Sequence, residues 1–224
     1  MSESDLVAEQ FEDAEQQLET ATLGMWAFLA TEVLFFGVMF VAYAALRLRW
    51  PQQFAEGSRD LKLWLGGINT AVLLTSSLLV AIAVHAIRVG QNRLVVWLLI
   101  ATIILGFGFL AIKGTEYHLE SKEHLVPGVN FSPSPEMEKL PPDKRTPRPD
   151  QEKLFMLFYF VMTGFHALHV TVGLGVLAVM AVLAKRGLIN AEYPNPLQIS
   201  ALYWHFVDIV WIFLYPALYL LKLG

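Results

Sequence analysis

The chain has 224 residues, of which 55% are hydrophobic and 16% are charged, and its formal net charge is −4. Its mean hydropathy of +0.50 is typical of an integral membrane protein and excludes an ordinary soluble domain. The absence of cysteine excludes disulfides, cysteine-ligated metal centres and cysteine nucleophiles, and the acidic charge balance gives no indication of nucleic-acid binding.

The first 21 residues form an acidic segment that differs in composition from the rest of the chain. They include seven Asp or Glu and no Lys or Arg, the reverse of the basic start of a cleavable signal. Residues 3–20 have an apolar stripe at helical spacing, which predicts either an amphipathic helix resting on a protein neighbour or a solvated tail. The stripe consists of Val7, Phe11, Ala14 and Leu18.

The remaining residues, 22–224, are predicted to form a single all-α domain, an integral membrane bundle of five transmembrane helices. Each of five apolar runs is long enough to cross a bilayer at a rise of about 1.5 Å per residue. The runs cover residues 23–46, 65–87, 94–112, 154–184 and 197–221. The turn at residues 88–93 is so short that the second and third helices must be antiparallel neighbours.

Three polar stretches connect or follow these runs. Residues 47–62 are predicted to be a polar loop, and residues 113–118 a polar cluster at the membrane surface. The long loop at 118–151 holds seven of the eleven prolines, a composition that favours extended structure over a folded insert. Because it is too long for a simple connector, we expect this loop to contact a partner.

Glu32 lies near the middle of the first apolar run, where no residue within four positions can pair with its charge. A carboxyl group at that depth costs about 2.5–3.5 kcal/mol on insertion scales. We therefore expect that other helices supply its partner or that it stays protonated. An intramembrane acid of this kind indicates either a functional site or a neutral, hydrogen-bonded carboxyl inside a bundle.

The fourth and fifth runs carry further polar groups in their interiors. His166 and His169 are three residues apart on one helix face, and His205 and Asp208 have the same spacing on the last helix. Counting from helix ends places Glu32, His166 and Asp208 at depths of about 14–18 Å. The sequence therefore predicts one buried polar network of these five residues at a single mid-membrane level, without a stepped series of acids across the bilayer.

Four basic residues near the ends of the predicted helices are candidate ligands for phospholipid headgroups. They are Arg47, His85, Arg88 and Arg93. Long basic side chains at these positions reach the phosphate level of a membrane.

Two other functions also fit part of the pattern. A membrane metalloenzyme would use as ligands His166, His169, His205 and Glu116 or Asp208. The chain has only six His, and several lie near span ends, so we expect no metal site. A proton-coupled transporter would work through Glu32, but no inverted repeat is visible and five spans do not divide evenly.

Several of these segments resemble a known family. The stretches Thr163–Val170 and Tyr203–Trp211 are closely similar to signatures of cytochrome c oxidase subunit III. Three earlier stretches fit the same family: Gly24–Glu32, Asn69–Leu74 and Glu116–Tyr117. The resemblance covers the chain from about Leu23 to the C-terminus, except for the proline-rich loop.

The resemblance implies a non-catalytic subunit of a haem–copper oxygen reductase that itself binds no haem, copper or other metal. Haem and copper are then expected in the partner subunits, with direct packing against subunit I and association with subunit II. The family holds structural phospholipids in a V-shaped cleft and sustains proton uptake and turnover stability. Glu32 matches the family's buried, carbodiimide-reactive glutamate.

The resemblance also implies a location. Five spans, in place of the seven of mitochondrial members, favour a bacterial plasma membrane. The quinol-oxidase branch of the family also has five spans, so the number of spans does not identify the electron donor. The family places the N-terminus in the cytoplasm, and we follow it although the distribution of Lys and Arg between loops favours the reverse. The loop at 118–151 has no counterpart in the family and is a candidate contact for a further respiratory subunit.

Overall fold

In the computed structural model, the described residues are 14–59, 61–122, 126–127 and 149–220, and within them the regular structure is helical throughout. The helices are α1 (Ala14–Arg49), α2 (Pro51–Arg59), α3 (Leu63–Arg88), α4 (Asn92–Lys122), α6 (Pro149–Lys185) and α7 (Asn195–Tyr219). All of these except α2 are long and apolar enough to cross a membrane. The predicted fold class, an all-α bundle with five membrane-spanning helices, is confirmed.

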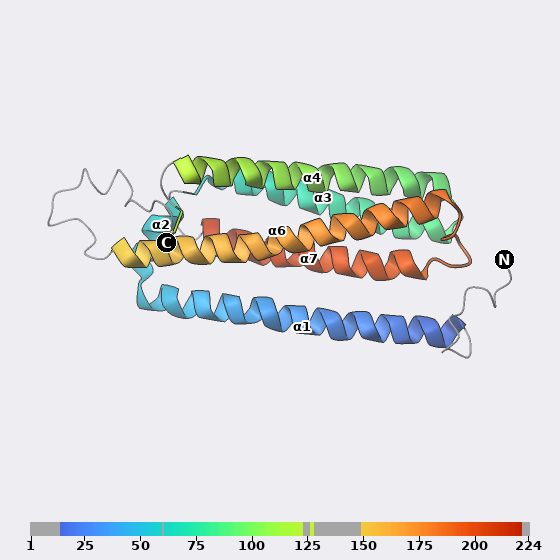
Figure 1. The fold of residues 1–224 in the computed structure, drawn as a ribbon, viewed down its shortest axis with the longest axis horizontal. Coiled ribbons are helices and arrows are strands. Elements are labelled where there is room, and N and C mark those ends of the chain that lie inside the picture. The colour runs from blue at the N-terminus through green and yellow to red at the C-terminus, as the bar shows by residue number, and fades with distance from the viewer. Residues whose placement is uncertain (1–13, 60, 123–125, 128–148, 221–224) are drawn as a thin grey trace.

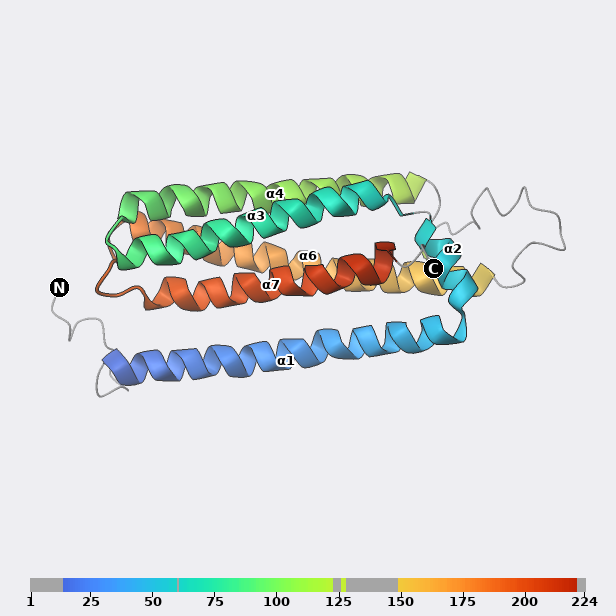
Figure 2. The same ribbon diagram turned by 180° about the vertical axis from the view of Figure 1, so that it is seen from behind.

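Four of the long helices form the bundle proper, and the fifth lies outside it. Neighbouring pairs around the bundle are α3 with α4, α4 with α6, α6 with α7 and α7 with α3. Helix α1 runs along the outer side of α6 and α7, and the short α2 crosses one end of the bundle against α6 (Figures 1 and 2). The start of α1 and the end of α7 lie at opposite ends of the bundle, as an odd number of spans requires (Figure 1).

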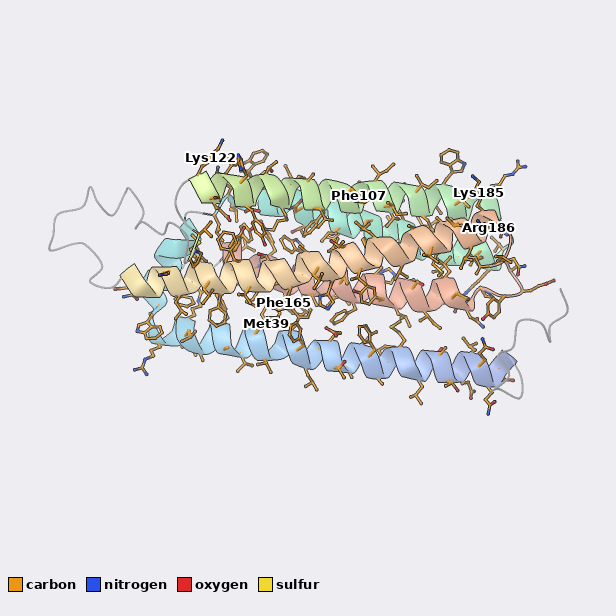
Figure 3. All side chains as sticks on the ribbon, viewed as in Figure 1. Met39, Phe107, Lys122, Phe165, Lys185 and Arg186 are labelled. Carbon is orange, nitrogen blue, oxygen red and sulfur yellow. The ribbon has the colours of Figure 1, made fainter. Side chains whose placement is uncertain are left out.

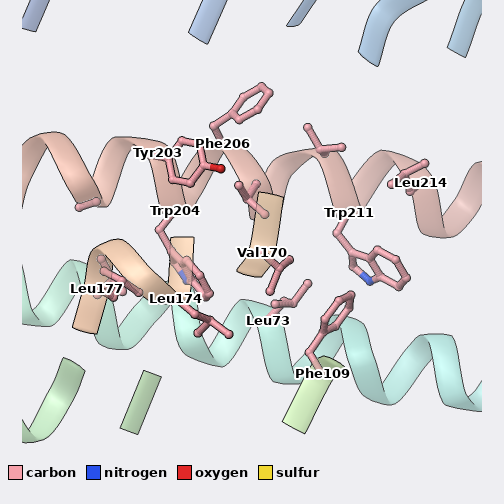
Figure 4. Packing of buried hydrophobic residues seen from close by; sticks show 14 of the residues in the cluster. Leu73, Phe109, Val170, Leu174, Leu177, Tyr203, Trp204, Phe206, Trp211 and Leu214 are labelled. Carbon is pink, nitrogen blue, oxygen red and sulfur yellow. The ribbon is translucent and has the colours of Figure 1, made fainter. Parts of the chain in front are cut away.

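Two tryptophans of α7 fill the centre of this bundle. Trp204 and Trp211 are fully buried and point toward the neighbouring helices (Figure 4). The indole N–H of Trp204 donates to Ser76 Oγ, and that of Trp211 donates to Thr70 Oγ1, each at 3.1 Å. Hydrogen bonds between helices and close packing drive helix association in lipid, where the hydrophobic effect does not act between helices.

The surface of α1 is mostly apolar and exposed. Only 17% of its most apolar window is buried, against 61% for α7. Large side chains such as Val33, Leu34 and Val38 are more than half exposed. This face therefore meets lipid or another protein when the chain is in a membrane.

Several boundaries differ from those predicted. Helix α1 begins inside the acidic segment, α4 continues ten residues past position 112 to Lys122, and α6 begins at Pro149, so the long loop is shorter than residues 118–151. The charged residues Lys113, Glu116 and Glu120 predicted an early end of α4, but they are buried in the protein. Hydropathy alone does not show whether a charged side chain faces the protein or the solvent. The other parts of the acidic segment and of the loop, 1–13, 123–125 and 128–148, lie outside the described residues.

The predicted polar loop at 47–62 contains the helix α2. Pro51 occupies its first position, where the fixed backbone angle of proline favours a helix start. Phe54 of α2 is buried against Phe155 of α6, and their ring centroids are 5.6 Å apart. The sequence predicted a loop here because α2 is too short and too polar to give the signal of a membrane-spanning helix.

Candidate functional site

Glu32 and His169 form a polar contact near the middle of the membrane-spanning helices. Glu32 comes from the middle of α1 and His169 from α6, and the distance between Glu32 Oε2 and His169 Nε2 is 3.0 Å. Their side chains are 19% and 15% exposed, respectively. The structure thus supplies Glu32 with a partner from another helix, as the isolated carboxyl in the sequence requires.

The hydrogen bonds of His169 determine how this pair can share a proton. His169 Nδ1 lies 2.8 Å from the carbonyl oxygen of Phe165, and since a carbonyl only accepts, Nδ1 carries a hydrogen. Nε2 then either accepts from a protonated Glu32 or, in an imidazolium, donates to a carboxylate. Both arrangements leave the pair neutral overall, which reduces the cost of placing it inside a membrane.

Aromatic side chains surround the pair. The ring centroids of Phe36 and Phe35 lie 5.2 Å and 6.4 Å from that of His169. The hydroxyl of Tyr203 donates to the His169 carbonyl oxygen at 3.1 Å. Phe165 of α6 and Met39 of α1 both lie between these two helices (Figure 3). These rings limit the access of water to the carboxyl group.

The predicted residues of α7 have other neighbours. His205 Nδ1 lies 2.6 Å from the hydroxyl oxygen of Ser77 on α3. Asp208 is 3% exposed and is a second neighbour of the Ser77 hydroxyl, although neither of its carboxyl oxygens meets the geometry of a hydrogen bond to a described residue. Ser77 of α3 is therefore a common neighbour of His205 and Asp208.

His166 is separated from His169 although they share a helix face. Its side chain is fully buried, and its ring packs near those of Phe109 and Trp211, at centroid distances of 5.6 Å and 5.1 Å. Neither ring nitrogen is hydrogen-bonded to any residue that the structure describes. The structure thus joins Glu32 to His169 but does not link the five predicted residues by hydrogen bonds into one network.

Sequence reasoning missed a second buried polar group, centred on Lys113 of α4. Its Nζ donates to Glu116 Oε2 at 2.8 Å, to the Tyr159 hydroxyl at 3.1 Å and to the Tyr219 hydroxyl at 2.7 Å. Tyr219 in turn donates to Glu116 Oε1 at 2.8 Å. Lys113 and Glu116 are 2% and 1% exposed. All three hydrogens of the ammonium group therefore have partners, and the cluster joins α4, α6 and α7.

The Lys113 cluster corrects two expectations. Residues 113–118 were predicted to lie at the membrane surface, yet Lys113, Glu116 and Glu120 are all buried. The buried polar groups also do not share one level, because they extend from Asp208 in the middle of α7 to Glu120 near the end of α4. One feature of the sequence does indicate this cluster. The spacing of the three charged residues of α4 places them on one helix face.

The four candidate lipid ligands lie near helix ends, as predicted. Arg47 is half-buried, and His85 is exposed. Arg88 is exposed and donates to Gln198 Oε1 at 3.1 Å. Arg93 is exposed and lines a cavity of about 420 Å³ between the start of α4 and the end of α6. Their binding of lipid stays a prediction.

Metal binding finds no support in the geometry. Among residues 14–59, 61–122, 126–127 and 149–220, no three His, Cys, Asp or Glu side chains are grouped so that they could hold a metal ion. The histidines named as ligands point to separate partners, because His169 contacts Glu32 and His205 contacts Ser77.

Comparison with known proteins gives one consistent result. The sequence profile of the family described as Cytochrome c oxidase subunit III matches residues 4–126 and 151–222. Quinol oxidase subunit 3 of Bacillus subtilis (strain 168) is 32% identical over 219 residues, covering 94% of this chain and 93% of that protein. Cytochrome c oxidase subunit 3 of Oncorhynchus mykiss is 32% identical over 204 residues, covering 88% of this chain and 67% of that protein. The unmatched interval, 127–150, falls within the proline-rich loop.

Proposed function

This chain belongs to the cytochrome c oxidase subunit III family, and from that premise we propose that it is an accessory, non-redox subunit of a respiratory haem–copper oxygen reductase. The supporting observation is the family match over nearly the whole chain, together with five helices that can span a membrane. In this assignment it packs against the catalytic subunit I beside subunit II, and those partners hold the haem and copper. The proposed location is a bacterial plasma membrane, with the N-terminus in the cytoplasm.

The proposed role of the subunit is to keep the proton-uptake path and active site of the catalytic subunit in working shape, not to conduct protons itself. The depths of the buried polar groups do not support this role, because these groups extend from Asp208 in the middle of α7 to Glu120 near the end of α4. The support comes instead from the Glu32–His169 pair. Its other hydrogen bonds within the described residues end on the backbone carbonyls of Phe165 and His169, so they provide no onward acceptor for a proton.

Phospholipid is proposed as part of the interface with the partner subunits. The exposed apolar face of α1 and the basic residues at the helix ends support this, since together they match the acyl chains and the phosphates of a bilayer. The long loop is proposed as a contact for a further respiratory subunit, because residues 127–150 lie outside the family match.

The electron donor has two candidates, cytochrome c and a quinol. Cytochrome c is the donor that the family description indicates, and we propose it first. The quinol alternative is supported by the Bacillus relative, whose whole length is nearly covered by this chain. Reduced cytochrome c and a quinol, offered separately to the purified complex, distinguish the two by which one supports oxygen consumption.

The test of the proposed function is copurification. An affinity tag on this chain, expressed in its own organism and extracted in mild detergent, is expected to retain a large haem-bearing subunit with oxygen-reductase activity. The isolated chain is expected to show no haem absorbance and no stoichiometric copper, iron or zinc. Recovery without any haem protein, or about one tightly bound transition metal per chain, contradicts the proposal.

A further inference from the structure

His205 holds a partly exposed imidazole in the middle of the membrane-spanning helix α7. It lies about 15 Å from the start of that helix at the usual rise per residue. Its Nδ1 is 2.6 Å from Ser77 Oγ of α3. Its Nε2 has no hydrogen-bond partner among the residues that the structure describes, and it is not one of the fully enclosed side-chain atoms. The ring therefore turns one nitrogen toward α3 and leaves the other accessible from outside the bundle.

The surface around this nitrogen is otherwise apolar. Ile209 and Ile212 follow His205 on the same side of α7 and are 51% and 41% exposed. Leu74, one turn before Ser77 on α3, is 48% exposed. Helices α3 and α7 lie side by side (Figure 2). We call the surface formed by Leu74, His205, Ile209 and Ile212 the α3–α7 face. One polar atom thus lies at mid-membrane depth on an apolar face.

Lipid is a poor neighbour for His205 Nε2. Acyl chains offer no hydrogen bond, and histidines within membrane-spanning helices rarely face them. Thr75 shows the contrast, because it is exposed on α3 while its hydroxyl donates to the Ala71 carbonyl of its own helix at 2.8 Å. The contact with Ser77 fixes the imidazole and leaves Nε2 without an equivalent partner in the described structure. The α3–α7 face is therefore suited to a protein surface that carries a polar group at this depth.

The neighbouring hydroxyl determines which polar groups His205 can meet. Ser77 can donate to Nδ1 or accept from it, so Nε2 of a neutral imidazole is then a donor or an acceptor, respectively. A hydroxyl or an amide can fill either role, and neither group is charged, as the interior of a membrane favours. Side chains with these groups form hydrogen bonds between transmembrane helices.

We propose that the α3–α7 face binds a transmembrane helix of a partner subunit, and that His205 Nε2 hydrogen-bonds to a hydroxyl or amide side chain of that helix. The inference rests on the proposed function, because it requires that the chain assembles with other membrane subunits. It adds the face through which one of them is bound and the polar contact at its centre.

The variants His205→Asn and His205→Gln test the two ring nitrogens separately. The amide of asparagine reaches the position of Nδ1 and can keep the Ser77 contact, whereas the longer glutamine reaches the position of Nε2. In the complex purified in mild detergent, His205→Asn should hold its partner about three- to tenfold more weakly, the range for one hydrogen bond between membrane helices. His205→Gln should hold it as the parent chain does. Retention of the partner against increasing detergent is the measurement. Equal retention by both variants, or the opposite order, overturns the proposal.

A photoreactive benzoylphenylalanine in place of Ile209 tests the face with His205 intact. The matched control is the same group in place of Phe107, which is 60% exposed on α4, diagonally across the bundle from α7. Phe107 has nearly the same depth, because its neighbour Gly106 lies against the ring of Trp204. Irradiation of the purified complex should join position 209 to another subunit, whereas position 107 should react with lipid or detergent.

Three results of the irradiation overturn the inference. They are an adduct of position 209 with lipid alone, an adduct with a second copy of this chain, and an adduct of position 107 with another subunit as abundant as that of position 209. In each case the haem-bearing subunit in the same preparation leaves the proposed function standing. A preparation of the parent chain without a haem-bearing subunit contradicts the proposed function, and the inference that rests on it then fails as well.

Discussion

The carboxyl oxygen Oε2 of Glu32 lies 3.0 Å from Nε2 of His169, so a polar contact joins the outermost helix to the bundle at the middle of its length. A second polar contact lies near the end of the same helix, where the Tyr43 hydroxyl donates to the Ala217 carbonyl at 2.7 Å. Near the start of α1, Gln17 Nε2 donates to the Tyr193 hydroxyl at 3.4 Å, and ring contacts such as Phe35 with Phe165, at 5.1 Å between centroids, add to these polar contacts. The position of α1 against the bundle therefore depends on a small number of specific contacts.

Glu32→Gln tests whether the pair positions a helix or relays a proton. The amide can still donate to His169 Nε2, so the helix contact is kept while the ionisable group is lost. We expect the variant oxidase to retain most of its initial oxygen reduction and proton pumping and to inactivate faster during turnover. Successive oxygen-electrode assays and pumping measurements in vesicles provide the readout. Immediate loss of pumping with oxygen reduction intact would show that Glu32 is a proton relay.

A hydrophobic carbodiimide is expected to label Glu32 in preference to the other intramembrane acids. The reagent reaches carboxyls from the lipid phase, and the Glu32 side chain is 19% exposed, whereas Glu116 and Asp208 are 1% and 3% exposed. Peptide mass spectrometry locates the adduct, and Glu32→Gln should abolish it. Labelling of Glu116 or Asp208 with Glu32 spared contradicts this assignment.

The fold, and the need of Glu32 for a partner from another helix, could be predicted from the sequence for a simple physical reason. A bilayer requires each span to satisfy its own backbone, so apolar runs of sufficient length must be helices. The bilayer also makes an unpaired acid costly, so Glu32 stands out in its span and requires a polar partner, such as a histidine, from another span. The choice between His166 and His169 depended on which face of α6 meets α1, and packing alone decides that.

The Lys113 cluster was not accessible in the same way. A hydropathy count ends a span at the first charge, so Lys113 was assigned to the membrane surface. The structure continues α4 through Glu116 and Glu120, and tyrosines from α6 and α7 supply hydrogen-bond partners for Lys113 and Glu116. Those tyrosines are distant in sequence, and only the tertiary arrangement brings them to one place.

Gly173 and Gly175 of α6 form a matched pair for testing helix packing. A Cβ atom at Gly173 would meet the Trp204 ring at 2.8 Å, whereas a Cβ at Gly175 meets nothing within 4 Å. The ring cannot easily move, since its N–H bonds to Ser76. Gly173→Ala should destabilise the chain by about 1–3 kcal/mol through overpacking. Gly175→Ala should be neutral or slightly stabilising, as alanine favours helix more than glycine does. Thermal unfolding in detergent compares them, and equal midpoints would contradict the close approach of Gly173 to the Trp204 ring.

The Lys113 cluster allows a test of whether a buried ion pair stabilises this fold. Lys113→Met removes the cation but keeps a long side chain, and it leaves the carboxyl of Glu116 buried with only Tyr219 as a hydrogen-bond donor in the described structure. Breaking one side of a buried pair costs about 3–5 kcal/mol, because an uncompensated charge remains. Lys122→Met is the control, since Lys122 is exposed at the end of the same helix. We expect a large loss of stability for the first variant and almost none for the second.

The double variant Lys113→Met/Glu116→Gln separates the charge from the shape of the site. If the cost of Lys113→Met comes from an unpaired carboxylate, neutralising Glu116 as well should recover much of the lost stability, since Tyr219 can still donate to the amide oxygen. Recovery should be incomplete, because Glu120 also lies within electrostatic reach of Lys113 and would lose that cation. Unfolding in detergent against increasing denaturant measures all three variants. A double variant no more stable than Lys113→Met would show that the lysine acts through its packing among the rings of Tyr159, Trp211 and Tyr219, at 4.9–5.3 Å, and not through its charge.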